Sequence, residues 1–128
     1  MKHSTFMLIA TLVGGLFGLS MLLAPEQMIK NMTTGAEASA LHVLQWAGTM
    51  LLSLSIINFF SRNDPGSAAL RAVMIGNIFM HLLGLIVDFY DLSIGFINIQ
   101  GLVSGLVVHL FFIAGFGYYL RKMKPAAI

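Results

Sequence analysis

Residues 72–91 form an apolar stretch long enough to cross a lipid bilayer, yet the stretch carries strongly polar side chains. At about 100° per residue, Asn77, His81, Gly84 and Asp88 fall within about 60° of one another on a helix. An ionisable group that faces hydrocarbon costs roughly 2.5 to 3.5 kcal/mol at the centre of a membrane helix. This polar face must therefore contact protein, and the stretch predicts a helix built into a membrane-embedded bundle.

The rest of the chain has the composition of such a bundle. Of 128 residues, 58% are hydrophobic and 9% are charged, whereas soluble domains carry about 25% charged residues. One crossing needs about 20 residues, so four spans use most of the chain. We therefore expect one all-α domain over residues 1–128, an integral membrane four-helix bundle that runs up-down-up-down. Its spans are predicted at residues 5–24, 41–60, 68–90 and 98–120.

The connections between the spans also carry structural signals. A short helix lying in the membrane interface is predicted over residues 25–33, because Pro25 suits a first helical turn and Glu26 and Lys30 complement the helix dipole. Residues 61–67, SRNDPGS, predict a tight turn. The second and third spans are therefore expected to form an antiparallel hairpin.

Gly14 and Gly18 give the first span a small-residue face on which another helix can pack closely. Such faces serve contacts within a chain and between chains alike. Besides the lipid bilayer, the expected partners are therefore a second copy of the chain or another membrane protein.

The positive charges indicate the orientation in the membrane. In a four-span arrangement one side carries Lys2, Arg62, Arg71, Arg121, Lys122 and Lys124, and the other carries only Lys30. By the positive-inside rule, both termini are expected in the cytoplasm, with the chain in the inner (plasma) membrane of a bacterium. Because these charges flank spans, they do not indicate nucleic-acid binding. The absence of cysteine excludes disulfides and cysteine-ligated metal sites.

A polar pocket is predicted inside the bundle. Its expected lining residues are Gln45, Thr49, Asn77, His81, Asp88 and His109. Counting about 1.5 Å per residue from the span ends puts His81 roughly 12 Å deep and His109 roughly 16 Å deep. If their helices turn these faces inward, the two imidazoles flank a common interior. The pocket is expected to open toward the outer side.

The function that we expect is non-enzymatic. Such a pocket can hold a lipid, a quinone or another apolar molecule, or the glycine faces can dock the chain onto a partner as an accessory subunit. This interpretation needs no cofactor. It also requires no catalytic residues.

The leading alternative is a b-type haem electron carrier, because imidazoles on facing helices can supply both axial ligands of a haem. His81 and His109 would be those ligands. A second alternative places a metal at the outer mouth of the pocket, with Glu37, His42, Asp88 and Asp91 as the candidate ligands.

A small membrane enzyme or an oligomeric transporter are further alternatives. The only serines well inside the spans are Ser53, Ser55 and Ser104, and the sequence shows no basic partner beside them. Four short helices would need to oligomerise to line a transport path.

Four blocks of the sequence resemble small bacterial four-helix membrane proteins of uncharacterised, loosely DoxX-like families. These blocks are GGLFGLSMLLAP, LQWAGTMLLSLSIINFFSRN, LRAVMIGNIFMHLLGLIVDF and HLFFIAGFGYYL. The resemblance covers nearly the whole chain and implies a four-helix bundle in a bacterial inner membrane. It implies no catalytic or binding residues.

Overall fold

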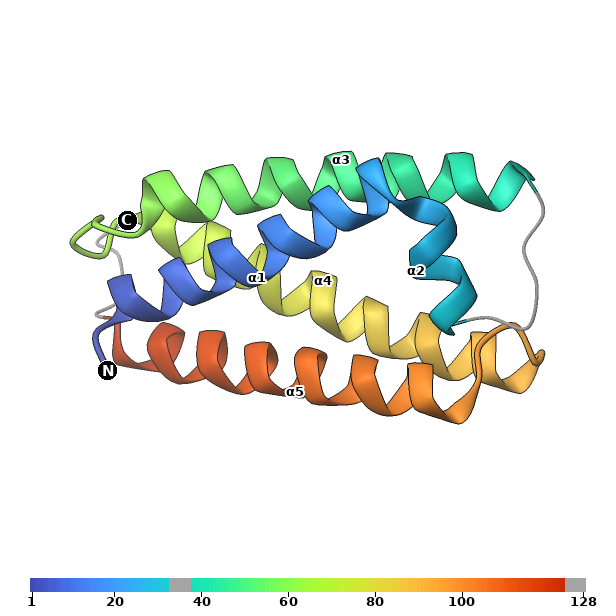
Figure 1. Cartoon of the computed structure of the whole chain (residues 1–128). Helices are drawn as coiled ribbons and strands as arrows, with labels where there is room; N and C mark the ends of the chain where they lie inside the picture. Colours follow the sequence, from blue (N-terminus) through green and yellow to red (C-terminus); the bar gives the residue numbers. More distant parts are fainter. Residues whose placement is uncertain (33–37, 124–128) are drawn as a thin grey trace.

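The computed structural model describes residues 1–32 and 38–123, and this part of the chain is all-helical, without strands. Its helices are α1 (His3–Leu23), α2 (Pro25–Met32), α3 (Ala38–Ser61), α4 (Ala68–Ser93) and α5 (Ile99–Lys122) (Figure 1). All but α2 contain a segment long and apolar enough to cross a membrane. Many large apolar side chains point outward from these helices, as expected where lipid replaces water. The fold is that of a multi-pass membrane protein.

The long helices are arranged as two pairs. α1 packs along α3, and α4 packs along α5, while contacts between the two pairs are sparse. Successive long helices run in opposite directions, and the short α2 crosses one end of the bundle (Figure 1). The beginnings of α1 and α4 and the ends of α3 and α5 therefore lie together at the other end.

Glycines bring α1 and α3 into close contact. A Cβ added to Gly18 would lie 2.9 Å from the carbonyl oxygen of Gly48 and 3.0 Å from the backbone nitrogen of Leu52. A Cβ on Gly14 would lie 2.7 Å from the hydroxyl oxygen of Ser55. The small-residue face predicted for the first span thus packs against α3, within the chain.

An aromatic core closes the bundle near the N-terminus. Its fully buried members include Phe6, Met7, Met74 and Phe116. The Phe6 ring meets the Phe116 ring edge to face, with 4.9 Å between centroids, and such contacts add to the packing of the core. This core joins α1 to both α4 and α5 at one end of the molecule.

The turn between α3 and α4 is held by the carboxylate of Asp64. The backbone amides of Gly66 and Ser67 donate to its Oδ1 at 2.8 and 2.7 Å, and the Ser67 hydroxyl donates to its Oδ2 at 2.6 Å. The hydrogen bond from the Ser67 hydroxyl is the largest cause that holds the pKa of Asp64 below its usual value, and the two backbone hydrogen bonds add to it. Gly66 has φ +121°, which favours glycine. Ser67 then caps α4 by accepting from the amide of Leu70.

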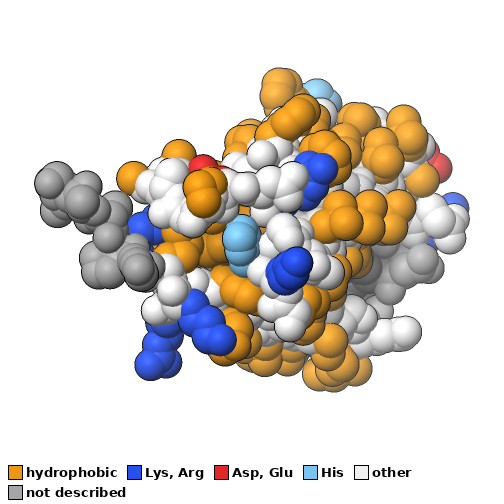
Figure 2. All heavy atoms as spheres, turned by 90° about the vertical axis from the view of Figure 1, so that its left-hand side faces the viewer, with side chains coloured by type: hydrophobic (Ala, Val, Ile, Leu, Met, Phe, Trp, Pro, Cys, Tyr) orange, Lys and Arg blue, Asp and Glu red, His pale blue; other side chains and the backbone are white. Residues whose placement is uncertain are grey.

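Basic residues gather at the end of the bundle that carries this turn. We call this the basic end, defined by Lys2, Arg62, Arg71, Arg121 and Lys122. Figure 2 looks onto this end and shows Lys and Arg side chains spread across it. Of the acids in the described residues, only Asp64 lies there, whereas Glu26, Asp88 and Asp91 belong to the opposite end. Lys124 and Glu37 lie outside the described residues.

Candidate ligand cavity

A cavity of about 460 Å³ lies between the two helix pairs. All five helices contribute to its wall, including the short α2 through Met28. Most of the wall is apolar, with Val13, Phe17, Met21, Leu51, Leu54, Val108 and Phe112 among its residues. Mostly apolar walls with a few polar groups are typical of small-molecule sites, which usually measure about 300–1,000 Å³.

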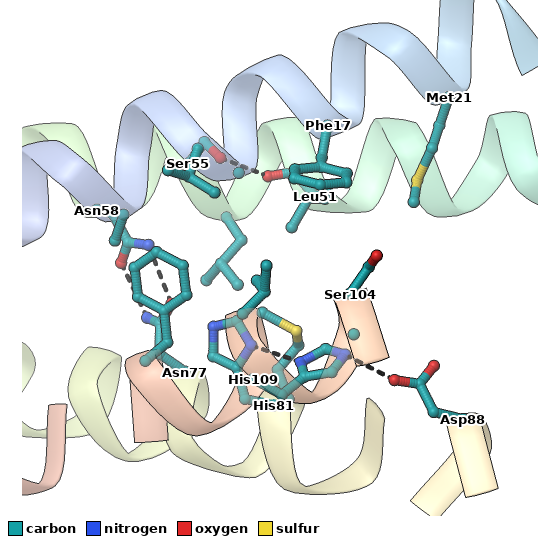
Figure 3. Close-up of a pocket in the computed structure, with 18 of the residues that line it drawn as sticks. Phe17, Met21, Leu51, Ser55, Asn58, Asn77, His81, Asp88, Ser104 and His109 are labelled. Carbon is teal, nitrogen blue, oxygen red and sulfur yellow. Dashed lines mark hydrogen bonds and ion pairs between the residues drawn. The ribbon is translucent and has the colours of Figure 1, made fainter. Parts of the chain in front are cut away.

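A line of polar side chains runs along the α4–α5 side of this cavity. Nδ1 of His81 and Nδ1 of His109 lie 2.8 Å apart and share a hydrogen bond. Nε2 of His109 lies 3.6 Å from Oδ2 of Asp88, at ion-pair but not hydrogen-bond distance. Figure 3 shows this line from Asp88 through the two imidazoles. Oδ2 of Asp88 is buried and accepts no hydrogen bond from any part of the chain that the structure describes.

Two glycines make room for the line. A Cβ on Gly84 would lie 2.6 Å from Cε1 of His109, and a Cβ on Gly105 would overlap the Asp88 carboxylate. The His81 ring in turn stacks on Phe112, with 4.9 Å between centroids and 12° between planes. The backbone of α4 and α5 and the aromatic core therefore fix the positions of these side chains.

A pair of asparagines ties the two helix pairs together beside the cavity. Nδ2 of Asn58 on α3 donates to Oδ1 of Asn77 on α4 at 3.0 Å, and Nδ2 of Asn77 donates back to Oδ1 of Asn58 at 2.9 Å. Nδ2 of Asn77 also donates to the Val73 carbonyl at 2.8 Å. The two residues are 2% and 1% exposed, so their polar groups are satisfied almost entirely by each other.

The structure places four of the six predicted pocket residues in the cavity wall and two elsewhere. Asn77, His81, Asp88 and His109 line the cavity, whereas Gln45 and Thr49 do not. Gln45 donates to the carbonyl of Leu22, and Thr49 donates to its own helix at Trp46.

The face of α3 that lines the cavity carries Leu51, Leu54, Ser55 and Asn58. At about 100° per residue, Asn58 lies on the face opposite Thr49. Asn58 and Ser55 were absent from the sequence-based prediction of the pocket. Their helical spacing with Leu51 and Leu54 was a signal for this face. The sequence also places His42, Gln45, Thr49 and Ser53 together on another face of the same helix, and that face was taken as the inner one.

The geometry does not favour a haem between His81 and His109. Two axial imidazoles on one iron would hold their ligating nitrogens roughly 4 Å apart on either side of the macrocycle, since metal–imidazole bonds are about 2 Å. Here the two rings are hydrogen-bonded directly to each other. A macrocycle would have to displace this contact, and the stacking of His81 on Phe112 with it.

The residues proposed for a metal at the outer mouth are not gathered in the structure. No group of three His, Cys, Asp or Glu side chains that could hold a metal ion occurs within residues 1–32 and 38–123. Nε2 of His42 accepts a hydrogen bond from the Trp46 indole at 3.0 Å. Glu37 lies outside the described residues, so its part in that prediction is untested.

No family model matches this chain, and no curated protein or solved structure matches it significantly.

Proposed function

We propose that this chain is a bacterial inner-membrane protein that binds an apolar small molecule between its two helix pairs without transforming it. The observation that carries the proposal is the mostly apolar cavity of about 460 Å³ with the line Asp88–His109–His81 on one wall. The resemblance of the sequence to loosely DoxX-like membrane proteins is compatible with this localisation.

Binding is favoured over transport because packed side chains close one end of the cavity. The core residues Phe6, Met74 and Phe116 pack between the cavity and the basic end. Within the described residues, this core separates the cavity from the basic end. Binding is favoured over catalysis because the hydroxyls of Ser55 and Ser104 donate to carbonyls of their own helices and are not bonded to a base.

We further propose that the basic end faces the cytoplasm, because it carries all the Lys and Arg of the described residues except Lys30. The chain has no cysteine, so single cysteines can report the orientation. Asn63→Cys lies in the turn between α3 and α4, and Ile94→Cys lies just after α4 at the opposite end. In intact cells, a membrane-impermeant maleimide should label Ile94→Cys, and it should label Asn63→Cys only after lysis. The reverse pattern would contradict the orientation.

Filling the cavity should expel the bound molecule. Ser104 lines the cavity, and its hydroxyl bonds only to the Gln100 carbonyl of its own helix, so Ser104→Trp places an indole in the space at little structural cost. Organic extraction of the purified protein followed by mass spectrometry should recover an apolar molecule from the wild type. The yield from Ser104→Trp should fall about tenfold, the ratio that corresponds to about 1.4 kcal/mol of lost binding.

The matched control for this experiment is Val103→Trp. Val103 is the neighbour of Ser104 on α5, is 53% exposed and does not line the cavity. This variant should retain the extracted molecule at the wild-type yield. Identical extracts from the wild type and Ser104→Trp, with both proteins folded, would refute binding in the cavity.

A further inference from the structure

The two nitrogens of the His81 imidazole have different surroundings. Nδ1 is hydrogen-bonded to Nδ1 of His109. Nε2 has no hydrogen-bond partner among residues 1–32 and 38–123, and His81 is part of the cavity wall. What Nε2 offers to a molecule in the cavity depends on whether it carries a proton.

The Asp88 carboxylate, when ionised, favours one of the two neutral tautomers of His109. An ionised carboxylate only accepts hydrogen bonds. Its Oδ2 is buried without a donor and lies 3.6 Å from Nε2 of His109, so the electrostatically favourable tautomer of His109 places its N–H at Nε2. A lone pair in this position would instead face the negative charge.

The tautomer of His109 in turn sets that of His81. A neutral imidazole carries one N–H, so with Nε2 protonated, Nδ1 of His109 is an acceptor. The 2.8 Å contact then requires that Nδ1 of His81 donates. Neutral His81 therefore has a lone pair at Nε2, and stacking of its ring on Phe112 fixes the direction of that lone pair.

We propose that His81 Nε2 is a fixed hydrogen-bond acceptor in the cavity wall, and that the site therefore selects apolar molecules that carry a hydroxyl group. This inference rests on the proposed function, since it specifies the class of ligand for the same cavity. The hydroxyl would donate to His81, and the apolar body would contact side chains such as Phe17, Met21 and Leu51. Asp88 and His109 act as positioning residues, since they determine which nitrogen of His81 carries the proton and which one accepts.

A matched pair of fluorescent probes tests the selection. 2-Naphthol carries a hydroxyl that donates, and 2-methoxynaphthalene replaces this hydrogen by a methyl group and can only accept. We expect the wild-type protein in detergent to bind 2-naphthol up to about tenfold more tightly, since one net hydrogen bond contributes about 0.5–1.5 kcal/mol and about 1.4 kcal/mol corresponds to tenfold. Fluorescence titration of both probes, each corrected for partition into empty micelles, measures the ratio of the two Kd values.

Asp88→Asn tests the role of the carboxylate at unchanged shape. The introduced amide can donate as well as accept, so His109 is no longer held in one tautomer and His81 Nε2 alternates between acceptor and donor. The ratio of Kd values should fall from its wild-type value to nearly one, while 2-methoxynaphthalene binds at least as tightly as it does to the wild type. Asp91→Asn is the control, because Asp91 lies one turn further along α4 and does not line the cavity. It should keep the wild-type ratio.

The outcomes separate the two proposals. Equal binding of the two probes by the wild type, a preference for the methyl ether, or an unchanged ratio in Asp88→Asn would overturn the selection for hydroxyl groups but leave ligand binding in the cavity intact. If neither probe binds the wild type, or if both bind Ser104→Trp as tightly as they bind the wild type, the selection for hydroxyl groups in the cavity is overturned. Binding in the cavity as such is then decided by the extraction experiment with the wild type and Ser104→Trp.

Discussion

Replacing Gly18 by alanine is expected to destabilise the protein by about 1–3 kcal/mol, the usual cost of overpacking a filled interface. The added methyl group would meet backbone atoms of Gly48 and Leu52 at 3.0 Å or less. Backbone in a helix cannot move aside as a flexible side chain can, so α1 and α3 must separate along their contact. Thermal unfolding in detergent, followed by circular dichroism, should show a clearly lowered Tm.

Gly15→Ala is the matched control for this prediction. Gly15 lies on the same helix, but a Cβ there would be 4.0 Å from its nearest neighbour, Cβ of Ser55. Its Tm should be unchanged or slightly raised, since alanine favours a helix over glycine by up to about 1 kcal/mol. Equal Tm values for the two variants would contradict the close contact of α1 and α3.

Gly48→Ala extends the test to the other helix. A Cβ on Gly48 would lie 2.7 Å from the carbonyl oxygen of Gly18, so it meets the same contact from the opposite side. The double variant with Gly18→Ala should lose less stability than the sum of the single losses. Once the helices have separated for one methyl group, the second is accommodated at lower cost.

Replacing Asn77 by leucine is expected to lower the stability by about 1–3 kcal/mol, because it leaves the buried amide of Asn58 without its partner. The side-chain amide of Asn58 makes no other hydrogen bond within the described residues. The same unfolding assay in detergent measures the loss. Ser53→Ala is a suitable control, since Ser53 is exposed and its hydroxyl bonds only within α3.

The double variant Asn58→Leu with Asn77→Leu separates pairing from packing. With both amides removed, no buried polar group is left unsatisfied, so the double variant should be more stable than Asn77→Leu alone. A double variant that loses the full sum of the single losses would show that the two amides stabilise the protein independently of each other.

The inward face of α4 is an example of what the sequence can predict. Polar side chains in a long apolar helix have few acceptable positions, so the sequence alone places Asn77, His81 and Asp88 toward protein. Four long apolar helices follow from the same argument applied to the whole chain. The structure adds the meeting of His81 with His109, since estimates of depth alone allow a spread of several ångströms.

The orientation of α3 is an example of what the sequence could not decide. Its polar residues are spread around the helix, so both the face of Thr49 and the opposite face of Asn58 could have been the inner one. Hydroxyls such as Thr49 can bond to the carbonyl of a preceding residue in their own helix and then tolerate lipid. The inner face is instead selected by Gly48, which permits contact with α1, and by the pairing of Asn58 with Asn77. Both depend on a second helix.

The two ends of the cavity differ, because the aromatic core lies between the cavity and the basic end. Phe6, Met7, Met74 and Phe116 fill the bundle there, while the wall of the cavity extends to Asp88 and Met28 toward the other end. If the cavity holds an apolar molecule as proposed, entry and exit are expected near α2 and the end of α4, away from the basic end.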